Sequence, residues 1–203
     1  MSTPGNTLED LVEILKRQAP QTLDLLTARS EMEFEQAFSA LLEQAVNHLE
    51  TNKKSYRDLD EEGLSSVIAA RLSMPGLGVS QETHSNGHVD ITVQLECVSP
   101  MRRKLCEAKI YKGYAYHVGG LDQLLSRYTT GREGRGLLII YVRKANIAGL
   151  IKELRIQMDS KRPCVQRGDT LDCLLKWSFL STHAHACGED VEVGHIGCNL
   201  FVE

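Results

Sequence analysis

Asp90, Glu107 and Lys109 are the residues whose types and spacing best suit catalytic chemistry in this sequence. Glu107 and Lys109 are two positions apart, so on a β-strand their side chains lie on one face. Two carboxylates held close together repel unless a cation lies between them, and carboxylate oxygens on rigid strands suit Mg²⁺ or Mn²⁺. A lysine beside that cation can orient or deprotonate a water molecule, or stabilise charge on phosphorus. The three residues therefore predict metal-assisted hydrolysis of a phosphodiester bond.

The strands that position these residues follow one another along the chain. Alternating apolar side chains predict three strands, at residues 77–83, 89–98 and 105–111. Aspartate is a poor strand residue, so Asp90 either stands at a solvated strand end or is directed at a ligand. A hairpin loop at 99–103, centred near its first two residues, places Asp90 opposite Lys109 and Thr92 opposite Glu107. On that register the charged residues share the polar face of the hairpin.

A helix before the first strand offers a further carboxylate. It runs from about residue 60 to 73 and stops before Pro75, and Leu64 and Ile68 lie on its apolar face. Glu61 projects from that same face, whereas Glu62 points away. Glu61 is therefore the first candidate for a helix carboxylate at the site, and Glu62 is the alternative. The simpler interpretation is that Glu61 only complements the helix dipole.

These motifs together resemble the PD-(D/E)xK nuclease superfamily, in which an aspartate precedes an E-x-K sequence on the next strand. Here that sequence is Glu107-Ala108-Lys109, and the helix at 119–128 (GGLDQLLSRY) resembles the glutamine-containing helix of the RecB-like and Mrr-like branches. The resemblance covers about residues 60–144. Asp90 follows Val89 where proline is common in the superfamily, and Gln123 and Tyr128 are five residues apart where the RecB-type pattern has four.

The resemblance implies a role for each matching residue. Asp90 and Glu107 would hold Mg²⁺ or Mn²⁺, with the carbonyl of Ala108 as a further ligand. Lys109 would position the attacking water, and Glu61 would bind a second metal ion or that water. Gln123 would support the metal site, and Tyr128 would pack or contact substrate.

The order of elements predicts an α/β fold with a central mixed sheet, specifically a restriction-endonuclease-like αβββαβ core flanked by helices. Residues 8–48 are expected to form helices broken near Pro20. The run at 137–142 is apolar on both faces, which is typical of a central, usually parallel, strand. The remaining elements are expected to be a helix at 145–158 and a C-terminal β-hairpin formed by 171–180 and 191–202. We therefore expect an N-terminal helical extension at 1–50 and a nuclease-like domain at 51–203.

Composition narrows the function class without selecting one. The chain has 203 residues, a net charge of −4 and 42% hydrophobic residues, which is ordinary for a globular protein and argues against a general nucleic-acid coating protein. The longest apolar runs are too short to span a membrane. Six cysteines without a CxxC pair indicate reduced thiols, and the cytoplasm is the expected location.

The residues expected to contact nucleic acid lie near the predicted site: Lys112, Arg127, Tyr128, Arg132 and His88. Sequence-independent affinity comes from positive charge on the phosphate backbone. Arg102-Arg103-Lys104 is expected in the hairpin loop, at the far end of the strands. The glycine-rich loop at 130–136 lacks the spacing of a nucleotide-binding loop.

A second cluster of potential ligands lies near the C-terminus. His183, His185 and Cys187 alternate as they would on one strand face, and a hairpin brings His195 and Cys198 close to them. Zinc accepts such ligands, although the spacing matches no standard zinc ribbon or finger. The other interpretation is a polar strand end with buried thiols.

The sequence thus favours a metal-dependent DNA nuclease, of the kind that serves restriction, phage defence or repair, with RNA as the other candidate substrate. The acidic balance suggests modest affinity for DNA, so a homodimer or a targeting protein is expected to deliver the substrate. Two alternatives come from other classes: an inactive relative that uses the fold to bind nucleic acid, and an adaptor whose N-terminal helices dock a partner.

Overall fold

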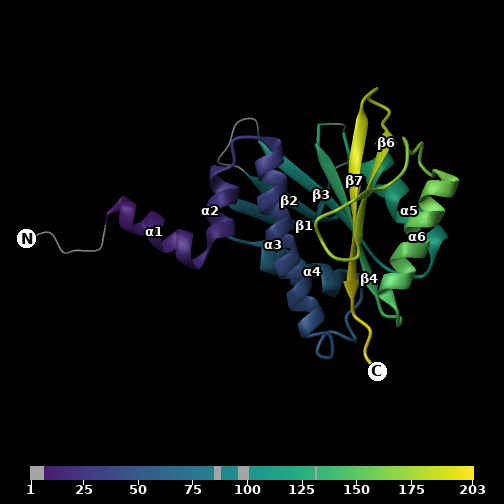
Figure 1. Ribbon diagram of the computed structural model, residues 1–203, viewed down its shortest axis with the longest axis horizontal. Helices are drawn as coiled ribbons and strands as arrows, with labels where there is room; N and C mark the ends of the chain where they lie inside the picture. The colour runs from purple at the N-terminus through teal and green to yellow at the C-terminus, as the bar shows by residue number, and fades with distance from the viewer. Residues whose placement is uncertain (1–6, 85–87, 96–100, 131) are drawn as a thin grey trace, which may run out of the picture. The chain divides into compact units, whose positions relative to one another are not determined.

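A seven-stranded mixed sheet organises the larger part of the chain (Figure 1). The computed structural model describes residues 7–84, 88–95, 101–130 and 132–203. The strands are β1 (Leu77–His84), β2 (His88–Leu95), β3 (Arg102–Ile110), β4 (Arg135–Val142), β5 (Leu171–Asp172), β6 (Ser178–Ala184) and β7 (Asp190–Asn199). They lie in the order β1-β2-β3-β4-β7-β6-β5. β4 pairs in parallel with both β3 and β7, which confirms the central parallel strand that its apolar sequence predicted.

The described helices are α1 (Leu8–Gln18), α2 (Pro20–Thr27), α3 (Glu31–Thr51), α4 (Glu61–Leu72), α5 (Tyr114–Gln123) and α6 (Ile147–Lys161), with a π-helical turn, η1 (Leu124–Tyr128), directly after α5. Asp60 caps α4 through a 2.9 Å hydrogen bond from the Gly63 amide, and Asn146 caps α6. The break at Pro20 is confirmed, because proline starts α2 at its first position. None of the helices in the described ranges is long and apolar enough to cross a membrane.

The chain divides into two compact units, and the boundary falls between Gln44 and Ala45, within α3. The sequence places the corresponding boundary near residue 50. In the first unit Phe34 and Phe38, one helical turn apart, stack with ring centroids 5.9 Å apart. The second unit contains the sheet, α4, α5 and α6.

Three predicted boundaries are wrong. β3 begins at Arg102 rather than at residue 105, because Arg102 and Arg103 pair with β2, so they belong to a strand and not to the loop. α5 begins at Tyr114 rather than at residue 119, since Gly113, at φ +124°, ends the preceding extended chain. The segment expected as one strand at 171–180 contains the two-residue β5 and only the start of β6.

The register of the β2–β3 hairpin differs from the prediction by two residues. Ile91 pairs with Cys106 and Thr92 with Leu105, so Asp90 lies nearest Glu107 and not Lys109. A shift of two residues keeps every side chain on its face, and the predicted common face is therefore retained. The turn is centred one residue earlier than expected, and most of it (residues 96–100) lies outside the described residues.

Helices cover both faces of the sheet in the second unit (Figure 1). α4 packs on one face, where the Ser65 and Tyr141 hydroxyls lie 3.3 Å apart. α5, η1 and α6 cover the other face over a buried apolar core that includes Leu121, Leu138 and Leu154. Thr92 and Glu107, on the predicted polar face of the hairpin, are therefore buried on this side of the sheet.

Candidate active site

The candidate site lies where β2 and β3 separate. Their backbone pairing ends at Ile91 and Cys106, so the next β3 amide on that side, that of Ala108, lies beyond the paired part of β2. The Asp90 side chain bonds to this amide instead. Its Oδ2 accepts a hydrogen bond from the Ala108 amide at 2.7 Å. The carboxylate thus replaces a strand hydrogen bond, and this explains why an aspartate stands in a strand sequence.

Glu61 accepts a hydrogen bond from the next β3 amide on the same side of the strand, that of Ile110. Its Oε1 accepts hydrogen bonds from the Ile110 amide at 3.2 Å and from the Tyr116 hydroxyl at 3.0 Å. Its Oε2 lies 3.7 Å from the Lys109 ammonium nitrogen. Because Glu61 is the first residue of α4, the helix N-terminus also favours its negative charge. The structure places Glu61 in the cluster and leaves Glu62 exposed.

Lys109 forms the shortest ion pair of the cluster. Its Nζ lies 2.6 Å from Oε1 of Glu107, whose side chain is 1% exposed. Burial by itself lowers the pKa of Lys109, but the hydrogen bond and charge of Glu107, with the charges of Asp90 and Glu61, raise it overall. Lys109 therefore carries a full positive charge between two carboxylates.

Glu107 has the most unusual environment in the site. Its second oxygen, Oε2, is buried and has no hydrogen-bond partner among the described residues. Burial, followed by the negative charge of Asp90, raises the pKa of Glu107 to about 7, although Lys109 acts in the opposite direction. Despite the Lys109 ammonium, the burial of Glu107 and the nearby charge of Asp90 therefore still disfavour its ionised form.

The oxygen atoms of Asp90, Glu107 and Ala108 are of the chemical type that a hard divalent cation binds. The Ala108 carbonyl points to the same side of β3 as its amide, which is the side of Asp90. Carboxylate and carbonyl oxygens are the ligands that Mg²⁺ and Mn²⁺ prefer. No group of three His, Cys, Asp or Glu side chains within the described ranges is arranged to hold a metal ion, and the Lys109 ammonium lies between Glu107 and Glu61.

Comparisons with known proteins add no assignment. Neither a family model, nor a curated protein, nor a solved structure matches this chain.

Gln123, the remaining predicted member of the site, is half-buried at the last position of α5. Among the described residues, no hydrogen bond joins its side chain to Glu107 or Lys109. The chain continues from Gln123 into η1, which packs against β3 and β4. The structure therefore brings together Glu61, Asp90 and the Glu107–Lys109 pair, and it does not show Gln123 bonded to them.

The predicted nucleic-acid contacts are placed in part. Lys112 is exposed, and its Nζ lies 4.7 Å from the centre of the Tyr116 ring, next to Glu61. Arg127 and Arg132 are also exposed. The side chains of His88 and Tyr128 lie outside the described residues.

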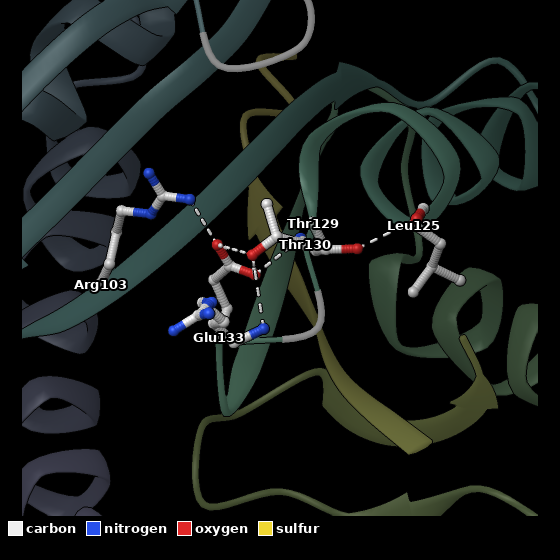
Figure 2. Close-up of polar contacts among 6 residues, drawn as sticks. Arg103, Leu125, Thr129, Thr130 and Glu133 are labelled. Atoms are coloured by element: carbon white, nitrogen blue, oxygen red, sulfur yellow. Dashed lines mark hydrogen bonds and ion pairs between the residues drawn. The ribbon is translucent and has the colours of Figure 1, made fainter. Parts of the chain in front are cut away.

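Arg103 and Arg135, two other basic residues of the sheet, have structural partners. Figure 2 shows Arg103 of β3 bonded to the buried carboxylate of Glu133, which also accepts a hydrogen bond from the Thr130 amide at 2.9 Å. Burial raises the pKa of Glu133, but bonding to Arg103 and to backbone amides outweighs burial and lowers it overall. Arg135 pairs with Glu192 at 2.5 Å. The glycine-rich loop is thus tied to the sheet by Glu133.

Sequence reasoning missed two residues of α5 that touch the site. Tyr116 donates its hydroxyl hydrogen to Glu61, and Gly120 lies so close to Lys109 that an added Cβ would be 3.0 Å from its Cγ. The pair Gly119-Gly120 inside a predicted helix was the available signal, since glycine there indicates a close approach. No sequence pattern links Tyr116 to Glu61.

The C-terminal His and Cys residues do not form the arrangement that zinc requires. His183 and His195 are fully buried, and each uses both ring nitrogens in hydrogen bonds. His185 and Cys187 follow the end of β6, where the Cys187 amide donates to the His185 ring. The described cysteines are all free thiols: Cys106, Cys164, Cys173, Cys187 and Cys198.

Proposed function

We propose that this protein is a metal-dependent nuclease of the PD-(D/E)xK superfamily, with a restriction-endonuclease-like core that hydrolyses phosphodiester bonds in DNA. One observation carries the proposal. The Lys109 ammonium contacts a buried Glu107 carboxylate, one oxygen of which has no hydrogen-bond partner in the described part of the chain, and Asp90 lies on the adjacent strand. A buried carboxylate whose pKa is raised to about 7 beside a lysine is typical of a catalytic site.

Each residue of the site would have a separate role in the reaction. Asp90, Glu107 and the Ala108 carbonyl would hold Mg²⁺ or Mn²⁺, which would polarise a phosphate oxygen and lower the pKa of bound water. Lys109 holds its charge where the attacking water and the developing charge on phosphorus would lie. Glu61 keeps Lys109 in place through the 3.7 Å contact, and it is also the candidate ligand for a second cation or for the water.

Lys112 and Tyr116 support a nucleic-acid substrate. They form an exposed cation–aromatic pair beside Glu61, and such a pair can contact a phosphate and a base. Arg127 and Arg132 are exposed and would add phosphate contacts, whereas Arg103 and Arg135 are held by carboxylates. We place this activity in the cytoplasm, where the five described thiols would remain reduced.

A cleavage assay with Lys109→Met tests the proposal. Methionine retains most of the stem that packs on Gly120 but lacks the ammonium, so cleavage of linear and supercoiled DNA with Mg²⁺ or Mn²⁺ should fall by about 10²–10³-fold. Lys152→Met makes the same change on the exposed surface of α6, and it should cleave like the wild type. EDTA should stop cleavage by the wild type, and an RNA substrate in the same assay identifies the preferred polymer.

Cleavage by Lys109→Met at the wild-type rate would contradict the assignment. Absence of metal-dependent cleavage by the wild type on every substrate would favour the alternative, an inactive nuclease-fold protein that binds nucleic acid or holds a complex together.

A further inference from the structure

A continuous chain of hydrogen bonds runs through the buried face of the sheet, away from the charged cluster. His117 Nε2 on α5 lies 3.0 Å from His195 Nδ1 on β7, and His195 Nε2 lies 2.6 Å from the Ser181 hydroxyl on β6. That hydroxyl lies 2.7 Å from His183 Nε2, and His183 Nδ1 lies 3.0 Å from the Cys164 carbonyl oxygen. The four side chains are no more than 2% exposed, so water does not compete with these bonds.

The Cys164 carbonyl oxygen, at one end of the hydrogen-bond chain, determines which atom of each pair donates. A carbonyl oxygen only accepts, so the His183 proton must be on Nδ1, and its Nε2 must then accept from Ser181. The Ser181 oxygen in turn accepts from His195 Nε2, which leaves His195 Nδ1 to accept from His117 Nε2. With neutral rings, one arrangement of protons satisfies every contact.

The surroundings keep the rings neutral and in place. Burial lowers the pKa of His117 to about 3, and burial lowers the pKa values of His195 and His183 as well. The Phe179 ring stacks on His195 with centroids 4.3 Å apart. Cys164 has φ +52°, a left-handed conformation that non-glycine residues rarely adopt, and this turn presents its carbonyl to His183.

α5 connects this chain to the candidate site. His117 anchors α5 to β7, and the preceding residue, Tyr116, bonds to Glu61. One turn after His117, Gly120 packs on the stem of Lys109. A displacement of His117 would therefore move both α5 residues that contact the charged cluster.

We propose that the histidine–serine chain is a positioning network that holds α5 against the sheet and thereby sets Lys109 against Glu107. His117 is a positioning residue, because it acts through α5 and its ring bonds to His195 rather than to any charged residue among those described. The catalytic consequence rests on the proposed nuclease function, whereas the proton arrangement and the position of α5 do not.

The first test measures the tautomers directly. Long-range ¹H–¹⁵N spectra of the full chain labelled with [¹⁵N]histidine distinguish protonated from unprotonated ring nitrogens. His183 should carry its proton on Nδ1, and His195 and His117 should carry theirs on Nε2, with all three rings neutral at pH 7. Any other tautomer, or a charged ring among the three, would overturn the chain.

The second test compares His117→Gln with His117→Leu. The glutamine amide can donate to His195 in place of Nε2–H, whereas leucine cannot. His117→Leu should shift the amide signals of Ile110 and Gly120, and it should lower kcat for DNA cleavage about 10- to 100-fold with little change in KM. His117→Gln should restore most of both readouts. Ser181→Ala breaks the chain at another point and should move the same signals, in case His117→Leu does not fold.

The two proposals fail in different ways. Unchanged Ile110 and Gly120 signals in folded His117→Leu would overturn the positioning role, whatever the cleavage assay shows. If those signals move as expected and no variant or wild-type protein cleaves nucleic acid, the nuclease proposal fails and the network stands.

Discussion

Two buried polar groups lie on the same face of the sheet, and they differ in how completely their members satisfy one another. Leu138 separates them, because it pairs with Glu107 on one side and with His195 on the other. The Glu107–Lys109 group is charged and leaves one buried carboxylate oxygen without a partner in the described residues. The histidine chain is neutral, and a single proton arrangement satisfies every contact along it.

The difference separates a reaction site from a structural support. A buried polar network whose members satisfy one another makes the fold more rigid, whereas a buried charge with a strongly shifted pKa is typical of functional sites. The histidine chain also has one buried polar atom without a hydrogen-bond partner among the described residues. This atom is Nδ1 of His117, at the end of the hydrogen-bond chain. In the charged group, the atom without a partner among the described residues is Oε2 of Glu107, the residue that pairs with Lys109.

The largest expected effect comes from Glu107→Gln, which removes the charge and keeps the shape. Cleavage should fall by about 10²–10³-fold. The free energy of unfolding at pH 8 should rise by on the order of 1–3 kcal/mol, because the folded-state pKa of about 7 means that ionised Glu107 opposes folding above its ordinary pKa of 4.5. Chemical denaturation at pH 8 measures this change. Glu62→Gln, on the exposed side of α4, is the matched control and should alter neither quantity.

A fall in stability of Glu107→Gln at pH 8 would show that the ion pair with Lys109 outweighs the cost of burying the carboxylate. The charged group would then be a structural ion pair, and the contrast with the histidine chain would disappear.

The histidine chain should make the fold sensitive to acid. Its rings have pKa values below the ordinary 6.5, so the unfolded chain binds protons that the folded chain excludes. Their contribution is constant above pH 6.5 and is lost as the pH falls, with a slope of up to about 1.4 kcal/mol per pH unit for each ring. His117→Gln has one fewer such ring, so its free energy of unfolding should fall less steeply than that of the wild type between pH 6 and pH 4. Equal slopes would contradict a buried, neutral His117.

The smallest expected effect is that of Tyr116→Phe. It removes one partly exposed hydrogen bond to Glu61, a bond worth about 0.5–1.5 kcal/mol, so kcat should fall about three- to tenfold. Tyr114→Phe, on the same helix, removes a hydroxyl that has no hydrogen bond to Glu61 within the described ranges, and it serves as the control in the same cleavage assay. A loss above a hundredfold in Tyr116→Phe would give Tyr116 a direct part in the reaction.

The sequence predicts local features of the site because they depend on short-range periodicity. Alternation along β2 and β3 places Asp90, Glu107 and Lys109 on a common face, and this holds despite the two-residue error in register. The helical spacing of Leu64 and Ile68 predicts that Glu61, rather than Glu62, points towards the sheet, and Glu61 does bond to the Ile110 amide of β3.

Features that depend on distant pairing could not be predicted. The contact between His117 and His195 exists because β7 inserts beside β4 in parallel, and no local pattern specifies that neighbour. The alternation of His183 and His185 indicates a strand but does not show that β6 ends at Ala184. The zinc interpretation assumed that His185 and Cys187 continue the strand, whereas they follow its end.

Binding of Mn²⁺ to the free protein is the decisive measurement of whether Asp90 and Glu107 hold a divalent cation. Calorimetric titration of the wild type should show a saturable site, and Asp90→Asn combined with Glu107→Gln should abolish it while Glu62→Gln retains it. Equal Mn²⁺ binding by the wild type and the double variant, or no binding by the folded wild type, would contradict the account.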